Sequence, residues 1–172
     1  MPLLLSSALG KPIGVTMLKH RAVIRFGIIL LSISLSLVTQ VQAASCEKVV
    51  SAVNAQFPST IDQRELIEML RSLDHTNNKK LPPKFVTKHE ARSRGWKAGE
   101  DLWSVEGLRG SSIGGDQFKN LEGRLPGNKW RESDLDYKGG HRGGKRLVFS
   151  RDGRRFVTVD HYRTFLEIPA CR

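Results

Sequence analysis

The sequence predicts an α+β domain in which N-terminal helices pack on a twisted antiparallel β-sheet. Two observations indicate this class. Apolar residues recur at helical spacing between residues 46 and 73, whereas from residue 107 onward glycines, aromatic residues and short alternating apolar runs replace that pattern. Helical segments followed by strands are typical of α+β domains, whereas in α/β folds helices and strands alternate along the chain.

Residues 1–43 have the pattern of an export signal and are excluded from the fold. A basic segment, residues 19–25, precedes an apolar stretch of 13 residues, 26–38, which is shorter than the roughly 20 residues that span a bilayer. We expect cleavage after Ala43, and a start at Met17 would give a signal of ordinary length. Residues 44–172 are thus predicted to form one exported domain, secreted or periplasmic.

This domain is predicted to begin with three helices. Apolar residues at three- and four-residue intervals predict helices over residues 46–57 and 61–73, separated by Pro58. A third, shorter helix is indicated by Thr87-Lys88-His89-Glu90, a capping box in which Thr87 and Glu90 would satisfy each other's backbone, with Gly95 at the helix end. Lys88 therefore lies in the first turn of that helix.

The clearest strand signal is KRLVFSRDGRRFVTVD, residues 145–160, where two alternating runs flank Asp-Gly. Asp-Gly favours a two-residue type I′ turn, which would pair Arg146 with Val159 and Val148 with Val157. His161 would then point to the same face of the sheet as Arg146. The opposite face would carry Leu147, Phe149, Phe156 and Thr158.

The two cysteines, Cys46 and Cys171, lie at opposite ends of the predicted domain. In an exported chain such a pair favours a disulfide, although a lipid anchor on Cys46 is an alternative. Residues 44–172 carry 24 Lys and Arg against 17 Asp and Glu, since residues 1–43 hold four of the 28 cations and no acidic residue. The resulting charge of +7 suits a polyanionic partner. The histidines show no metal-ligand spacing with the cysteines.

Five polar side chains form a set suited to splitting an RNA phosphodiester without a metal. A carboxylate such as Glu132 could deprotonate the ribose 2′-hydroxyl, and an imidazole such as His161 could protonate the leaving 5′-oxygen. The charge on the phosphoryl oxygens would be held by Arg142, Arg146 and Lys88. Taken singly, these residues have structural alternatives: a packed strand histidine, a solvated glutamate and a charged sheet edge.

From Leu81 to the C-terminus the chain resembles the barnase family, the small secreted guanyl-preferring ribonucleases of bacteria. The segments that carry the resemblance are LPPKFVTKHEA, SIGGDQFKN, EGRLPG, WRESDLDY and DHYRTF. Residues 44–80 match weakly and form a longer helical part. The resemblance implies the microbial ribonuclease fold and metal-independent cleavage of single-stranded RNA 3′ of guanosine, to a 2′,3′-cyclic phosphate. It implies no cofactor.

The resemblance also implies residue roles. Glu132 corresponds to the general base and His161 to the general acid, while Lys88, Arg142 and Arg146 correspond to the phosphate binders. Asp134 would orient the two arginines. The guanine site corresponds to Phe118, Lys119, Asn120, Leu121, Glu122 and Tyr162.

Leu121 departs from the family, which typically has arginine there. That arginine supports base and phosphate binding and contacts barstar, the family's intracellular inhibitor. The sequence therefore leaves two hypotheses: a monomeric guanyl-preferring ribonuclease with a barstar-like inhibitor, or an RNA-binding or inhibitor-binding domain of the same fold with weak catalysis.

Overall fold

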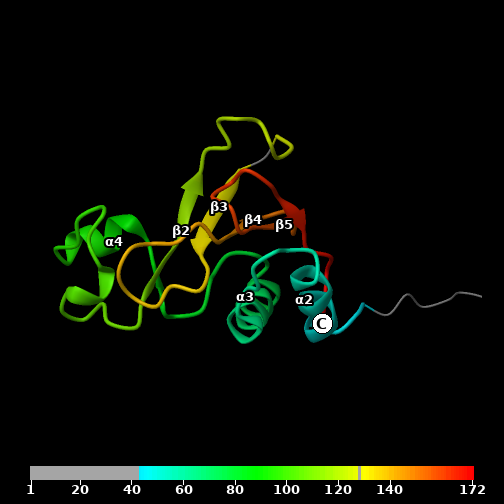
Figure 1. The fold of residues 1–172 in the computed structure, drawn as a ribbon, viewed down its shortest axis with the longest axis horizontal. Coiled ribbons are helices and arrows are strands. Elements are labelled where there is room, and N and C mark those ends of the chain that lie inside the picture. Colours follow the sequence, from blue (N-terminus) through cyan, green and yellow to red (C-terminus); the bar gives the residue numbers. More distant parts are fainter. Residues whose placement is uncertain (1–42, 128) are drawn as a thin grey trace, which may run out of the picture. The chain divides into compact units, whose positions relative to one another are not determined.

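Six strands lie in the sheet in the same order as in the chain, β1 to β6, and Figure 1 labels β2 to β5. The computed structural model describes residues 43–172 except Asn128, so the predicted signal segment lies almost wholly outside the described residues. The strands are β1 (Phe85–Val86), β2 (Ser112–Phe118), β3 (Trp130–Asp134), β4 (Arg146–Ser150), β5 (Arg155–Thr158) and β6 (Leu166–Glu167). With the helices below, they confirm the α+β class.

The sheet is mixed rather than wholly antiparallel. β1 pairs with β2 in parallel, whereas every other neighbouring pair is antiparallel. A parallel pair needs a long crossover, and residues 87–111 supply it with the helix α4 (Lys88–Ser93) and the 3₁₀ turn η1 (Leu102–Ser104). The expectation of an all-antiparallel sheet is wrong at this edge.

The two N-terminal helices form as predicted, and they lie side by side on one side of the sheet (Figure 1). α2 is Cys46–Asn54 and α3 is Gln63–His75. Their buried apolar side chains share one core cluster with Leu147 and Phe149 of β4 and Val157 of β5. These two helices therefore cover one face of the sheet.

A smaller cluster lies on the other face. It contains Leu125, Trp130, Val148 and Phe156. The strand register explains the division, because Val148 and Phe156 are direct partners, whereas Leu147 pairs with Val157 on the helix-covered face. Polar residues of β3 and β4 on this second face, which α2 and α3 do not cover, are free to form a site.

The capping box predicted for α4 is present. The Thr87 hydroxyl accepts a hydrogen bond from Glu90 N at 3.1 Å, and the Glu90 carboxylate accepts one from Thr87 N at 2.7 Å. These bonds from Thr87 lower the pKa of the Glu90 carboxyl. The cap fixes the start of the helix and so the direction in which Lys88 projects.

The hairpin between β4 and β5 differs from its prediction by one residue. Arg146 pairs with Thr158 and Val148 with Phe156, not with Val159 and Val157. The loop has three residues, since Ser150 N donates to Arg154 O at 3.0 Å, and only Gly153 has a positive φ, of 97°. This is a type I turn followed by a left-handed glycine, the other common hairpin loop that Asp-Gly accommodates. The predicted grouping of Leu147 and Phe149 with Phe156 and Thr158 is consequently wrong.

The predicted disulfide between Cys46 and Cys171 is confirmed. Both residues are buried in the helix-side core, and two backbone hydrogen bonds, Cys46 N to Arg172 O and Arg172 N to Ala44 O, flank the bridge. The C-terminal end therefore lies beside α2 (Figure 1). Among the described residues, no helix has the length and apolar character needed to cross a bilayer.

Candidate active site

The candidate site is built around Glu132, in the middle of β3 on the face opposite α2 and α3. Its side chain is 9% exposed. One carboxylate oxygen lies 2.7 Å from the Lys88 ammonium and the other accepts a hydrogen bond of 2.7 Å from the Tyr162 hydroxyl. Lys88 is itself held by its backbone N–H, which donates to Asp116 at 2.9 Å. A buried carboxylate is thus fixed at the sheet surface between two donors.

Asp134, two residues further along β3, holds two arginines on the same face. Arg142 contacts it in a bidentate manner, with Nε and Nη2 at 2.6 and 2.7 Å from the two carboxylate oxygens. The Arg146 Nε lies 3.0 Å away. Burial tends to lower the pKa of Arg142, but its hydrogen bonds and charge attraction to Asp134 outweigh this and raise it. Both guanidinium groups are therefore fixed and positively charged.

Tyr162 joins these two parts of the site. Its hydroxyl donates to Glu132 and accepts from Arg146 Nε at 3.1 Å, and its ring stacks on Phe118 with centroids 5.1 Å apart. Burial, aided by the hydrogen bond to Glu132, raises the pKa of Tyr162 above its ordinary value, although Arg146 opposes this. The phenol stays protonated and can donate throughout the neutral range.

His161 reaches the site from a turn and not from a strand. β5 ends at Thr158, and both His161 and Tyr162 have left-handed backbone conformations, with φ of 60° and 69°. The strand position expected from the alternating pattern is therefore wrong. The imidazole is exposed and its ring centroid lies 5.1 Å from that of Tyr162. Left-handed conformations are uncommon for residues other than glycine and are strained.

Hydrogen bonds that the side chains of Asp160 and Thr158 accept from the backbone hold this strained turn. The Asp160 carboxylate accepts from the backbone N–H groups of Arg163 and Thr164 at 3.1 and 3.0 Å, and the Thr158 hydroxyl accepts from Tyr162 N at 3.1 Å. Burial tends to raise the pKa of Asp160, but these hydrogen bonds and those of two threonine hydroxyls lower it to about 2. Since this is below the ordinary value of 3.8, Asp160 stabilises the fold above about pH 4 and loses this effect as the pH falls toward 2.

Gly144 lies against the backbone of His161 and offers a test of this placement. A Cβ at Gly144 would lie 3.1 Å from His161 N, and the Gly144 carbonyl accepts the His161 N–H at 3.1 Å. We predict that Gly144→Ala shifts the turn by a few tenths of an ångström and lowers kcat on RNA about 10-fold with KM little changed.

The matched control for this change is Gly127→Ala, since a Cβ at Gly127 meets nothing within 4 Å. Steady-state cleavage of a dinucleotide by both variants checks the prediction. Equal kcat for the two variants would contradict the proposed packing of Gly144 on His161.

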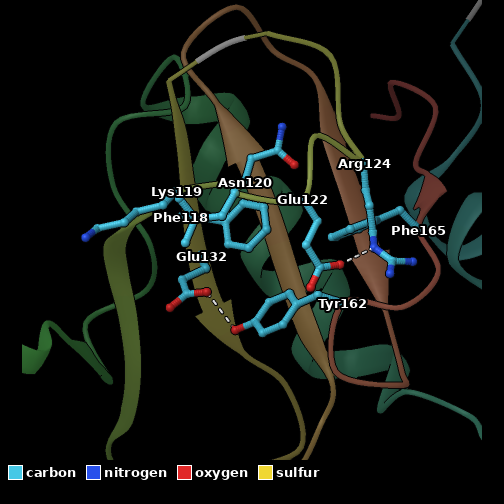
Figure 2. A pocket seen from close by; sticks show the side chains of 9 residues that line it. Phe118, Lys119, Asn120, Glu122, Arg124, Glu132, Tyr162 and Phe165 are labelled. Atoms are coloured by element: carbon cyan, nitrogen blue, oxygen red, sulfur yellow. Dashed lines mark hydrogen bonds and ion pairs between the residues drawn. The ribbon is translucent and has the colours of Figure 1, made fainter.

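A cavity of about 250 Å³ opens beside Glu132 (Figure 2). Its wall includes Glu132, Tyr162 and the loop that follows β2, which contributes Phe118, Lys119, Asn120, Leu121, Glu122 and Arg124, and Phe165 completes it. The loop is shaped by Asn120, whose side chain makes two hydrogen bonds with the backbone of Leu125, at 2.7 and 3.1 Å. Asn120 adopts a left-handed conformation, with φ of 47°.

Within this cavity Glu122 and Arg124 form an ion pair (Figure 2). Arg124 also donates to the carbonyl oxygen of Arg163, which links the loop to the His161 turn. The two side chains are 68% and 44% exposed, so the pair is worth at most about 1 kcal/mol and exchanges readily for a ligand. Leu121 is 87% exposed, an unusual position for a large apolar side chain.

The structure thus brings every proposed site residue onto one face of the sheet or into the adjoining loop. Sequence reasoning missed the bridging position of Tyr162, the part of Arg124 in the loop and the anchoring hydroxyl of Thr158. An aspartate at the start of a turn, as in Asp160-His161-Tyr162, was the available signal for the tight turn. Among the described residues, one group of potential metal ligands converges, but it consists of Asp74 and the two disulfide sulfurs.

Comparisons with known proteins agree with this geometry. A family model described as ribonuclease matches residues 71–169. The chain is 46% identical over 93 residues to a ribonuclease of Heyndrickxia coagulans, and this match covers 52% of the chain and 84% of that protein. It is equally similar to ribonucleases of Bacillus intermedius and Bacillus pumilus, of which it covers 57%.

Proposed function

Because the chain belongs to the ribonuclease family, we propose that it is an exported, metal-independent endoribonuclease that cleaves single-stranded RNA 3′ of guanosine by transesterification. The observation that carries this proposal is the convergence, on one face of the sheet, of a buried carboxylate, an exposed imidazole and two fixed arginines. Carboxylate and imidazole supply the proton transfers, and the arginines supply positive charge where the phosphorane develops it.

In the first step Glu132 removes the proton of the ribose 2′-hydroxyl. The 2′-oxygen bonds to phosphorus, the bond from phosphorus to the 5′-oxygen breaks, and protonated His161 donates its proton to that oxygen. The product is a 2′,3′-cyclic phosphate. In a slower second step neutral His161 takes a proton from water, and the water oxygen bonds to phosphorus. The bond from phosphorus to the 2′-oxygen breaks and Glu132 returns its proton to that oxygen, which gives a 3′-phosphate and restores both groups.

The arginines have donors left for the phosphate. Arg142 uses Nε and Nη2 on Asp134, and Arg146 uses Nε and Nη1 on protein oxygens, so Arg142 Nη1 and Arg146 Nη2 donate no hydrogen bond to any described residue. Every buried side-chain nitrogen of the described residues has a hydrogen-bond partner. Since Arg142 Nη1 and Arg146 Nη2 have none among these residues, both are accessible at the surface and open to a ligand. Each can donate to a phosphoryl oxygen without releasing Asp134.

Guanine would occupy the cavity beside Glu132. The Glu122 carboxylate would exchange Arg124 for the N1 and N2 hydrogens of the base, loop amides would donate to O6, and the base would stack on the aromatic wall. The phosphate 3′ of this base would then lie over Glu132, which lines the same cavity.

Glu122→Gln tests the base preference. We expect the ratio of kcat/KM for GpU over ApU to fall about 10-fold or more, because an amide cannot accept from both guanine donors and presents an NH₂ group to one of them. Glu68→Gln is the matched control, since it makes the same substitution at an exposed glutamate of α3, on the helix-covered side of the sheet. An unchanged ratio in Glu122→Gln would refute the assignment of the guanine site.

A second candidate function is RNA binding or inhibitor binding with weak catalysis, which the apolar, exposed Leu121 favours. Incubating the protein with a GpU-containing oligonucleotide in excess EDTA separates the two. A cyclic phosphate ending in guanosine supports the nuclease, and tight binding without cleavage supports the alternative. Loss of cleavage on adding EDTA would instead indicate a metal-dependent nuclease.

Export, an inhibitor and a monomeric state belong to the same proposal. A disulfide is typical of an oxidising compartment, which supports secretion or delivery to the periplasm after cleavage at Ala43. A ribonuclease retained in the cytoplasm would threaten the producing cell, so a barstar-like inhibitor is expected. Leu121 removes one of its usual contacts.

A further inference from the structure

A second basic surface lies on the helix-covered face of the sheet, at the end that α3 leaves open. Two adjoining hollows, of about 760 and 340 Å³, share Arg131 and Phe149 in their walls. The larger runs to Arg151 in the β4–β5 turn, and the smaller runs to Lys79 and Lys80 after α3. We call this continuous groove the trough.

Cations dominate the trough. Lys79, Lys80, Arg131 and Arg151 are exposed, and none of them forms an ion pair with a described residue. The acidic residue in its wall, Glu90, is already engaged by its capping box. Cations inside the fold behave differently, since Arg142, Arg146 and Arg155 each have a carboxylate partner. Unpaired cations along a groove favour a polyanionic ligand.

The trough leads toward the active site. Its smaller hollow is lined by Thr87 and Gly115, and the next residues, Lys88 and Asp116, are hydrogen-bonded to each other beside Glu132. Along β2 the chain alternates between the two faces: Asp116 pairs with Glu132, whereas Gln117 pairs with Arg131 in the trough. Because β1 pairs only with Ser112 and Ile113, residues 114–118 of β2 form an open edge of the sheet, and one step around this β2 edge separates the trough from the catalytic carboxylate.

We propose that the trough binds the sugar-phosphate backbone of single-stranded RNA beyond the cleaved bond, so that a long strand bends around the β2 edge. This inference rests on the proposed function for its ligand. A groove with the buried Phe149 in its wall and cations along it suits a flexible strand better than a flat bilayer. The contacts are to phosphates, so the trough contributes length dependence and not base preference.

The test is the triple variant Lys79→Gln, Arg131→Gln, Arg151→Gln. With a 20-nucleotide RNA containing one guanosine, we expect kcat/KM to fall about 10-fold at low salt. The slope of log kcat/KM against log salt concentration should become shallower by about two, because each cation that contacts a single strand contributes about 0.7 to this slope and the variant lacks three of them. With GpU, which is too short to reach the trough, kcat/KM should match the parent protein.

The matched control removes three exposed cations elsewhere, with Lys48→Gln, Arg64→Gln and Lys97→Gln, and has the same net charge. Its cleavage of the 20-nucleotide RNA should exceed that of the trough variant by several-fold. Equal losses in the two triple variants, or parent-like cleavage by the trough variant, would overturn the inference. Parent-like cleavage by the trough variant would indicate that the trough binds another ligand, such as an acidic protein.

A binding measurement separates this inference from the proposed function. Fluorescence anisotropy of the labelled 20-nucleotide RNA, in a Glu132→Gln background, reports binding without cleavage. If the parent protein fails to cleave GpU, the proposed function fails, but weaker RNA binding by the trough variant than by the control still supports the trough. Equal affinities would overturn it.

Discussion

Glu132→Gln and His161→Gln are each expected to lower kcat/KM for GpU by about 10²–10⁴-fold, the usual contribution of a positioned general acid or base. Glutamine keeps the shape of Glu132 and its contact with Tyr162, but it cannot take the proton of the 2′-hydroxyl. His161 is exposed, so its replacement removes a proton donor without opening the core. Single-turnover assays with product analysis check both changes.

The two variants should also fail to hydrolyse guanosine 2′,3′-cyclic phosphate, because that step uses the same groups in exchanged roles. Tyr162→Phe serves as a graded control, since it keeps the ring stacked on Phe118 and removes only the hydroxyl that bridges Glu132 and Arg146. Tyr162→Phe should lower kcat/KM for GpU less than either Glu132→Gln or His161→Gln does. Cleavage at the parent rate by Glu132→Gln or by His161→Gln, with the thermal unfolding temperature unchanged, would refute the proposed mechanism.

Local signals predicted the helices well. The α4 capping box involves residues three apart, and α2 and α3 follow from apolar spacing within one helix, so no distant contact had to be known. The parallel pair of β1 and β2 was out of reach by the same reasoning. β1 has only two residues, and its partner is separated from it by a crossover of 25 residues, 87–111.

The hairpin register shows a different limit. Asp-Gly is compatible with a two-residue loop and with a three-residue loop that ends in a left-handed glycine, and the two differ by one position in pairing. A shift of one residue exchanges the faces of a whole strand. The sequence argument that put His161 on the face of Arg146 therefore used the wrong geometry, since a turn held by Asp160 and Thr158, and not a strand, places the imidazole beside Tyr162.

The candidate site was predictable as a set of residues but not as a network. The resemblance supplied Glu132, Asp134 and the arginines, and the structure adds how they are connected. Tyr162 unites the carboxylate and the arginine cluster because the turn at residues 160–164 folds its ring back onto Phe118. Such a contact, between residues 44 positions apart, depends on tertiary packing that no local pattern encodes.

Removing the disulfide with Cys46→Ala and Cys171→Ala together is expected to lower the free energy of unfolding by about 2–5 kcal/mol. The bridge spans 125 residues, so it restricts nearly the whole unfolded domain, and the entropic cost of closing such a loop places the effect at the upper end of that range. Both cysteines also lie in the core that joins α2 to the sheet. Urea titration followed by circular dichroism measures the change.

Reduction of the parent protein provides the control for packing. If the bridge acts mainly on the unfolded chain, dithiothreitol should lower the urea midpoint of the parent protein to near that of the double variant, and it should leave the double variant unchanged. Because the disulfide lies on the helix-covered side of the sheet and Glu132 on the other, the folded double variant should cleave GpU at the parent rate. Equal urea midpoints for the oxidised parent and the double variant would show that the bridge adds nothing to stability, and a loss of cleavage by the folded double variant would show that α2 helps to shape the site across the sheet.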